Sequence, residues 1–358
     1  MTLLKAHFQK EFSGGPAISA AFEQSVDDYS VTVLFGPSGC GKTTILRCLA
    51  GLERPDSGSI SFRDQVWFDA ANGRNCSPQL RGVGYLFQEH ALFPHLTVAQ
   101  NIAFGLRKQP ADQLRRQVAE ILTAFELQSL ENRLPRQISG GQQQRTALAR
   151  VLIRKPRLLL LDEPLSALDS LLREQLRNEL RRRLAEFRIP AVIVTHDRTE
   201  AIALADQVVV MDRGQVLQAG PVAEVFSKPV NLRVAQLVGV DNVTRVKVLD
   251  IEDGLPRIQI GAQTLLAVGT AQPGTIASAC IRAEDVVLQR IPGASNSARN
   301  QLPAHVLTLT SEGPLVRVEV DCGFPLQILV TKAAVNDLEL TVGTRVFVLL
   351  KASAIHLV

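Results

Sequence analysis

The sequence predicts two domains of different class, a parallel α/β domain over residues 1–232 and a small all-β domain over residues 240–358. The chain of 358 residues is too long for one ordinary core and suits two. Apolar runs at residues 158–161 and 191–194 have the length of strands that are buried on both faces. From about residue 240, apolar and polar residues alternate with a period of two, which is typical of half-buried strands.

The α/β domain is predicted element by element from its apolar pattern. Residues 30–35 form a strand that ends at a glycine-rich turn. Between the strands at 158–161 and 191–194, apolar side chains recur at every third or fourth position and mark one face of a helix; they are Leu172, Leu176, Leu180, Leu184 and Phe187. The order strand, helix, strand predicts a parallel sheet covered by helices.

The all-β domain contains an internal repeat. Gly274-Thr275 returns 69 residues later as Gly343-Thr344, and Arg282-Ala283 returns as Lys351-Ala352. Residues 248–251 are echoed at 306–309, at a slightly different offset. We therefore expect two related β half-modules that close as a pair of small barrels, with strands at 315–321 and 345–349.

Composition and charge exclude several classes of protein. With 46% apolar and 21% charged residues, the chain is not disordered. The net charge of +4 is spread out and the longest basic block is Arg181-Arg182-Arg183, so no nucleic-acid partner is expected. No apolar run approaches the roughly 18 to 20 residues of a membrane span, and no signal peptide is evident, which predicts a cytosolic protein. Five cysteines without a C-x-x-C pair are expected to stay reduced; they are Cys40, Cys48, Cys76, Cys280 and Cys322.

A phosphate-binding loop is the clearest chemical motif. The pattern G-x-x-x-x-G-K-[ST] is matched between the strand at 30–35 and a helix that continues through Thr44; its residues are Gly36, Pro37, Ser38, Gly39, Cys40, Gly41, Lys42 and Thr43. Backbone N–H groups of such a loop hold phosphate oxygens, Lys42 is expected to reach the β and γ phosphates, and Thr43 is expected to bind Mg²⁺. The alternative is a chance match, which the flanking strand and helix disfavour.

Cys40 lies inside this loop, beside Lys42 and a helix N-terminus. Both neighbours lower the pKa of a thiol. We therefore expect Cys40 to be a reactive thiol that ATP protects.

Two acids follow the buried strand at 158–161. Asp162 is expected to hold Mg²⁺ through water, and Glu163 is placed to polarise the attacking water. An acidic pair at a strand end is otherwise a solvated end, and the phosphate-binding loop makes the catalytic interpretation the better one.

Ile138-Ser139-Gly140-Gly141-Gln142, directly before a helix, resembles the signature motif of ABC-type ATPases. Ser166-Ala167-Leu168-Asp169 resembles the D-loop of that family, Gln88 its Q-loop glutamine and Thr195-His196 its H-switch. The motifs stand in family order over the first 200 residues. The resemblance implies an ABC-type P-loop domain with a helical subdomain at about residues 89–153. It also implies ATP and Mg²⁺ as cofactors, with Gln88 as a further Mg²⁺ ligand and His196 at the γ phosphate.

The signature segment is expected to start a helix at residue 142 and to form a second anion-binding N-terminus. Since the loop at Gly36 already surrounds the phosphates, the resemblance implies a head-to-tail homodimer in which Ser139, Gly140, Gly141, Gln142 and Asp169 close on the partner's ATP. The alternatives stay open: Ser139 can be a plain helix cap, and His196 a surface or capping residue. Phe12 resembles the aromatic that stacks on adenine, with Phe8 as its competitor.

Residues 85–98 resemble the Q-loop stretch of import ATPases that act below a separate permease, where Leu92, Phe93 and Pro94 would offer an apolar cleft to a permease helix. Near the C-terminus, Ser297-Ala298-Arg299-Asn300 and Lys351-Ala352-Ser353 resemble the molybdate-binding Mop modules. The resemblance implies an oxyanion site of Ser297, Arg299, Asn300, Lys351 and Ser353. The alternative is that these are surface charges on a TOBE-like dimerisation domain.

Together these resemblances imply the ATP-hydrolysing subunit of a bacterial molybdate importer. Its partners would be a second copy, integral-membrane permease subunits and, indirectly, an external binding protein, and it would lie peripherally on the cytoplasmic face of the inner membrane. The alternatives are another cargo (sulfate, ferric ion, polyamine or sugar) and a soluble ABC-type ATPase outside transport.

Overall fold

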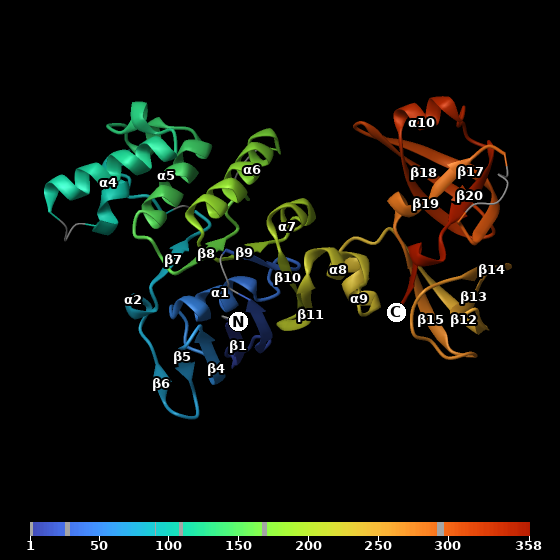
Figure 1. The fold of residues 1–358 in the computed structure, drawn as a ribbon, viewed down its shortest axis with the longest axis horizontal. Helices are drawn as coiled ribbons and strands as arrows, with labels where there is room; N and C mark the ends of the chain where they lie inside the picture. Colours follow the sequence, from blue (N-terminus) through green and yellow to red (C-terminus); the bar gives the residue numbers. More distant parts are fainter. Residues whose placement is uncertain (1–2, 26–28, 90, 107–109, 167–169, 292–296) are drawn as a thin grey trace. The chain divides into compact units, whose positions relative to one another are not determined.

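The computed structural model describes residues 3–25, 29–89, 91–106, 110–166, 170–291 and 297–358. The chain divides into two compact units, Met1–Val225 and Phe226–Val358 (Figure 1). The division falls within helix α8 (Val222–Ser227), a few residues before the predicted end of the first domain at residue 232. In the described part of the chain, no helix is both long and apolar enough to span a membrane.

The first unit is built on an eleven-stranded sheet in the order β6-β5-β4-β1-β2-β11-β10-β3-β9-β8-β7. Its strands are β1 (Leu3–Lys10), β2 (Ile18–Ser25), β3 (Val31–Phe35), β4 (Ser57–Phe62), β5 (Gln65–Asp69), β6 (Arg74–Asn75), β7 (Val83–Leu86), β8 (Leu158–Asp162), β9 (Ala191–Thr195), β10 (Gln207–Asp212) and β11 (Gln215–Pro221). Strands β10, β3, β9, β8 and β7 pair in parallel, and every residue of β3, β8 and β9 is buried. The predicted parallel layer is thus confirmed.

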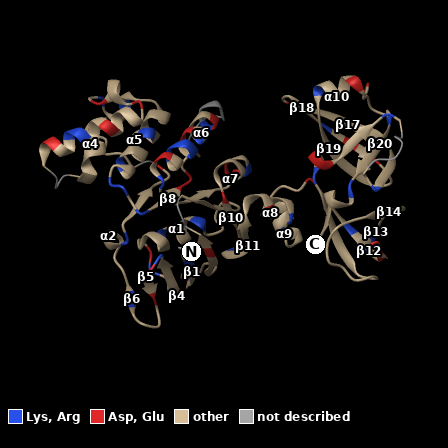
Figure 2. Cartoon of the chain, in the orientation of Figure 1, with Lys and Arg blue, Asp and Glu red and all other residues tan. Residues whose placement is uncertain are grey.

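Helices surround this sheet, and those between β7 and β8 form the helical segment of the unit. The helices and 3-10 turns are α1 (Lys42–Ala50), α2 (Pro78–Arg81), α3 (Val98–Ala103), η1 (Phe104–Leu106), α4 (Ala111–Ala124), η2 (Gln128–Leu130), η3 (Pro135–Gln137), α5 (Gly140–Leu152), α6 (Ser170–Phe187) and α7 (Arg198–Leu204). Helix α6 is the helix predicted from the apolar face, and Leu176, Leu180 and Leu184 are buried as expected. Basic and acidic segments are interleaved along α4 and α6 (Figure 2).

The second unit contains the end of α8 and the whole of α9 (Leu232–Leu237), and it consists mainly of two five-stranded sheets. One has the order β14-β13-β12-β15-β21 and the other β16-β20-β17-β18-β19. The elements are β12 (Asn242–Glu252), β13 (Leu255–Ile260), β14 (Gln263–Leu266), β15 (Ile276–Ile281), η4 (Ala283–Asp285), β16 (Val287–Gln289), β17 (Asn300–Glu312), β18 (Leu315–Asp321), β19 (Pro325–Thr331), α10 (Lys332–Asp337), β20 (Arg345–Leu350), η5 (Ala352–Ala354) and β21 (Ile355–Leu357).

The predicted repeat is confirmed down to single hydrogen bonds. In the first half, the Val248 N–H donates to the Thr275 carbonyl at 2.9 Å and the Gly274 N–H donates to the Val248 carbonyl at 2.8 Å. In the second half, Val306 makes the same pair of bonds with Thr344 and Gly343, at 3.0 and 2.8 Å. The register of the long first strand shifts just after Val248 in one half and just after Val306 in the other.

The two halves exchange their last strands, which the repeat alone did not predict. Strand β16 ends the first half and pairs with β20 of the second, while β21 ends the second half and pairs with β15 of the first. Two buried asparagines tie the halves together in the same reciprocal way. Asn242 of the first half bonds to the backbone of Gln327, and Asn300 of the second bonds to the backbone of Leu266. One apolar cluster contains side chains of both sheets, so the two halves share a continuous core and do not close as two separate barrels.

Candidate active site

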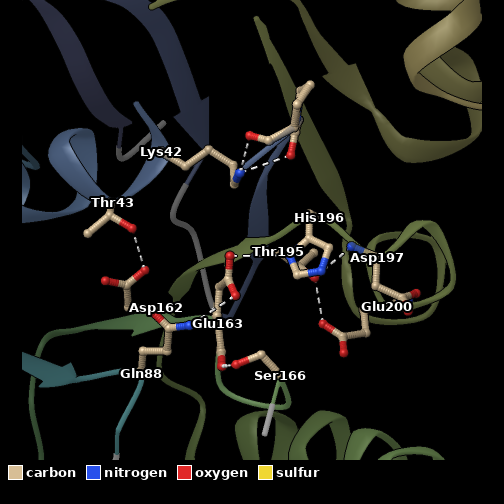
Figure 3. A network of polar contacts seen from close by, with 12 residues as sticks. Lys42, Thr43, Gln88, Asp162, Glu163, Ser166, Thr195, His196, Asp197 and Glu200 are labelled. Atoms are coloured by element: carbon tan, nitrogen blue, oxygen red, sulfur yellow. Dashed lines mark hydrogen bonds and ion pairs between the residues drawn. The ribbon is translucent and has the colours of Figure 1, made fainter. Parts of the chain in front are cut away.

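Four loops of the first unit meet at one edge of its parallel sheet (Figure 3). They follow β3, β7, β8 and β9, which are neighbours in the sheet and run in the same direction. Since the carboxyl ends of parallel strands lie at one edge, the loops bring together Lys42, Gln88, Glu163 and His196. The sequence placed these residues in one site, and the structure gathers them.

The loop between β3 and α1 has the shape that its glycines permit. Gly36 has a φ of 159°, and a Cβ at this position would lie 2.2 Å from the carbonyl oxygen of Met211, so only glycine fits. Helix α1 starts at Lys42, whose ammonium group is buried and donates to the carbonyls of Gly36 at 2.9 Å and Pro37 at 2.8 Å. The Lys42 ammonium is therefore held by two neutral carbonyl oxygens of its own loop. Ser38 and Gly39, at the tip of this loop, are exposed.

Cys40 corrects an expectation from the sequence. Its side chain is buried in the apolar cluster beneath the loop, and burial raises the pKa of its thiol although Lys42 acts in the opposite direction. Desolvation of the thiolate is the larger effect because the thiol points away from solvent. Cys40 is thus a buried residue whose Sγ lies 3.9 Å from the Lys42 ammonium, and its raised pKa disfavours the reactive thiolate.

Asp162 lies beside the start of α1 and is held on both oxygens. The Thr43 hydroxyl donates to Oδ1 at 2.8 Å, and the Tyr85 hydroxyl donates to Oδ2 at 3.1 Å. Burial and the nearby Asp162 raise the pKa of Tyr85, which therefore stays a neutral donor. This role of Tyr85 was not predicted from the sequence, although the residue belongs to the Q-loop stretch at 85–98.

The donors around Asp162 suit a small divalent cation. Thr43 offers a hydroxyl oxygen, Asp162 a carboxylate and Gln88 an amide oxygen, and Mg²⁺ prefers hard oxygen ligands of these kinds. The residues present therefore fit the expected metal.

Glu163 is the point on which side chains from three loops converge. Its Oε1 lies 3.2 Å from Nδ1 of His196, and its Oε2 accepts from Nε2 of Gln88 at 3.4 Å. The backbone of Glu163 has a φ of 43°. Its N–H donates to the Val194 carbonyl at 3.1 Å, and its carbonyl accepts from the Ser166 hydroxyl at 3.0 Å. A left-handed glutamate is strained, and strained residues of this kind concentrate at functional sites.

The two candidate adenine-stacking residues differ in exposure. Phe8 of β1 is 2% exposed and belongs to the core. Phe12 is 42% exposed, with the Lys10 ammonium 5.6 Å from its ring centre. Of the two, only Phe12 presents a ring that a ligand can reach.

The signature segment starts its helix two residues earlier than expected. Helix α5 begins at Gly140, not at residue 142, because Ser139 is the N-cap and forms a capping box with Gln142. The Ser139 hydroxyl accepts from the Gln142 N–H at 3.3 Å, and the Gln142 amide oxygen accepts from the Ser139 N–H at 2.9 Å. Ser139 and Gly140 are exposed, Gly141 is buried, and Asp169 lies outside the described residues.

Comparison with known proteins agrees with this geometry. A model of the ABC transporter family matches residues 22–166, and a model of the TOBE domain matches residues 296–357. A molybdenum import ATP-binding protein of Rhodopseudomonas palustris is 38% identical over 352 residues, which cover 96% of this chain and 92% of that protein. A spermidine/putrescine import ATP-binding protein of Nitratidesulfovibrio vulgaris is 43% identical over 258 residues, which cover 71% of this chain and 68% of that protein.

The chain belongs to the ATP-binding proteins of ABC importers. Two solved structures agree with this family assignment. The protein cbiO1 of Clostridium perfringens, part of an ABC transporter complex, matches with a TM-score of 0.56 at 28% identity, over 67% of this chain and 94% of that one. A dimeric ATP-binding cassette in a post-hydrolysis state with ADP and Pi matches with a TM-score of 0.52, also at 28% identity, over 62% of this chain and 99% of that one. The predicted fold, an ABC-type domain followed by a TOBE-like β domain, is confirmed.

In the TOBE region, the five residues expected to form an oxyanion site do not all line one hollow. A hollow of about 480 Å³ is lined by Ser297, Lys351 and Ser353, together with Glu284 and Asp285. Arg299 is exposed and is not one of the lining residues. Asn300 is buried, and its amide bonds to the Leu266 backbone at 2.7 and 2.9 Å, so the structure gives it the role of joining the two halves.

Proposed function

We propose that this chain is the ATP-hydrolysing subunit of a bacterial importer, with molybdate as its cargo. The observation that carries the hydrolytic assignment is the convergence of Gln88 and His196 on the Glu163 carboxylate beside the loop that Lys42 closes. A carboxylate in this position can accept a hydrogen bond from water that attacks the γ phosphate.

In this proposal the side chains divide the tasks, and Gln88 has two of them. Lys42 would leave the carbonyls of Gly36 and Pro37 to contact the phosphates, and Phe12 would stack on adenine. Glu163 polarises the water, and His196 and Gln88 fix the direction of its two oxygens. Thr43, Asp162 and Gln88 would hold Mg²⁺, which neutralises charge on the phosphate oxygens.

The second half of the ATP site would come from another copy of the chain. Helix α5 has thirteen residues, and its N-terminus is exposed beside Ser139 and Gly140. A helix N-terminus favours an anion, and the chain's own phosphate loop already surrounds one side of the nucleotide. We therefore place the signature segment of each subunit, with Asp169, on the nucleotide of the other in a twofold dimer.

The permease would dock on an apolar cleft next to the Q-loop. A cavity of about 340 Å³ is lined by Phe87, Phe93, Phe104 and Arg150, among others. The rings of Phe93 and Phe104 lie 4.3 Å apart, and the Arg150 guanidinium lies 5.3 Å from the Phe93 ring centre. Such a cleft suits the apolar face of a short helix, which would hold the chain on the cytoplasmic side of the inner membrane.

Molybdate is favoured as cargo by the relatives that match along nearly the whole chain. Besides the R. palustris protein, a molybdate/tungstate import ATP-binding protein of Pyrococcus horikoshii is 38% identical and covers 90% of this chain and 91% of that protein. Ser297, Lys351 and Ser353 around the hollow of the second unit would donate to a tetrahedral oxyanion. Polyamine import is the second candidate, since the spermidine/putrescine relative has the higher identity and Glu284 and Asp285 line the same hollow.

Uptake in cells separates the two cargoes. Cells that carry the Lys42→Ala variant in place of the wild-type chain should lose high-affinity molybdate uptake and keep spermidine uptake. Loss of spermidine uptake alone would transfer the proposal to polyamines. Calorimetry of the full chain with molybdate, tungstate, sulfate and spermidine tests the hollow itself; a preference for molybdate and tungstate over sulfate supports an oxyanion site, and absence of binding leaves the second unit as a dimerisation domain.

A further inference from the structure

His196 contacts Glu163 although little packing holds its ring. Its side chain is 50% exposed, and a cavity of about 30 Å³ lies among His196, Glu163 and Glu200. An imidazole in such surroundings has several accessible rotamers. Its position therefore depends on how firmly the backbone on either side of residue 196 is held.

A closed set of hydrogen bonds holds that backbone. Thr195, at the buried end of β9, donates from Oγ1 to Oε2 of Glu200 at 2.6 Å. The same Oγ1 accepts from the Asp197 N–H at 3.0 Å, and the Asp197 carboxylate accepts from the Glu200 N–H at 3.0 Å (Figure 3). The residues directly before and after His196 are thus linked through one hydroxyl group.

Glu200 is an unusual choice for a merely structural acceptor. It is 3% exposed, and burial raises the pKa of its carboxyl while the Thr195 hydroxyl lowers it. A buried carboxyl is costly unless it makes a specific bond. Glu200 bonds to Thr195, the residue directly before His196, and His196 contacts Glu163.

We propose that Thr195 and Glu200 form a positioning pair that keeps His196 within hydrogen-bond distance of Glu163 during hydrolysis. The inference rests on the proposed roles of His196 and Glu163. Neither member of the pair touches the nucleotide in this account. Their loss should therefore lower kcat and leave the KM for ATP nearly unchanged.

The test is a double-mutant cycle with the full chain. Thr195→Val removes the hydroxyl and keeps the shape, and it should lower kcat about tenfold with KM unchanged, while Thr195→Ser should restore the rate. In the His196→Ala background, Thr195→Val should have no further effect, because the pair acts through the imidazole. Glu200→Leu should reproduce Thr195→Val, which provides a second variant if the valine protein folds poorly.

Matched controls separate positioning from general damage. Thr331→Val removes a threonine hydroxyl that accepts from a backbone N–H at the start of α10 in the other unit, and it should leave ATP hydrolysis unchanged. If Thr195→Val lowers kcat equally in the wild-type and His196→Ala backgrounds, or does not lower it at all, the pair has no positioning role. If His196→Ala itself hydrolyses ATP at the wild-type rate, the proposed role of His196 fails, and the positioning pair fails with it.

Discussion

The phosphate loop and the signature segment both end at a helix N-terminus, yet they differ in what surrounds them. At α1 the Lys42 ammonium is buried and held by carbonyls of its own loop, and Cys40 packs beneath it. At α5 the capping box engages the N–H groups of Ser139 and Gln142, and Ser139 and Gly140 are exposed. The first site is assembled within the chain, whereas the start of α5 is exposed, as the proposed contact with a second copy requires.

The far ends of the two helices differ as well. The last carbonyls of α1 are capped by Arg81, which is fully buried and donates from Nη1 to Cys48 at 2.7 Å and Leu49 at 2.8 Å. The end of α5 leads to Arg154, which lines the proposed permease cleft. Helix α1 is therefore fixed at both ends by its own chain, which is what a phosphate loop needs, whereas α5 has both ends at surfaces proposed for partners.

The largest effect should come from Glu163→Gln. The amide keeps the shape but polarises water poorly, so ATP hydrolysis should fall about a thousandfold while ATP still binds to the α1 loop. Phosphate release measures the first effect. Light scattering with ATP and Mg²⁺ should detect a stable dimer. A variant that stays monomeric up to high micromolar concentration would contradict the proposal that the start of α5 binds the nucleotide of a second copy.

Ser139→Arg should block hydrolysis from the α5 side alone. The bulky cation would enter the partner's phosphate site, while ATP still reaches Lys42. Mixed with Lys42→Ala, which fails from the α1 side, it should recover about a quarter of the wild-type rate if subunits mix at random and sites act independently. No recovery from two inactive variants that form mixed dimers would mean that the two helix ends do not meet across chains.

Arg81→Met should reveal how firmly α1 is held. Methionine leaves the carbonyls of Cys48 and Leu49 without their donor in a buried site, so the free energy of unfolding should fall by about 3 kcal/mol. Denaturant unfolding measures the loss. Arg74→Met, at an exposed arginine of β6, is the matched control and should change the midpoint little.

The smallest effect is expected at Cys40. Because burial raises the pKa of its thiol, little thiolate is present at neutral pH, and labelling should be slow with or without ATP. Raising the pH should increase the thiolate fraction only as the pH approaches this raised pKa. Mass spectrometry checks this, with the partly exposed Cys76 as the internal reference. Equal labelling rates for the two thiols would show that Cys40 is reactive after all.

The sequence predicted what depends on local pattern. Buried parallel strands are unbroken apolar runs, so β8 and β9 and the acids and histidine after them were found directly. The burial of Cys40, the capping by Arg81 and the bond between Thr195 and Glu200 were missed, because each depends on which distant element packs nearby. The start of α5 was misplaced because a capping box allows two glycines to begin a helix that their propensity disfavours.

The exchange of β16 and β21 has a consequence for the order in which the protein can be made. Strand β15 receives its outer neighbour only from residues 355–357, which leave the ribosome more than seventy positions after β15 itself. Until then the first half of the β unit has an unpaired strand edge, which other chains can join. We therefore expect the two halves to fold together after residue 357 has been synthesised. A nascent chain stalled within β20 already contains the whole sequence of the first half. Both halves of such a chain should nevertheless be open to proteolysis.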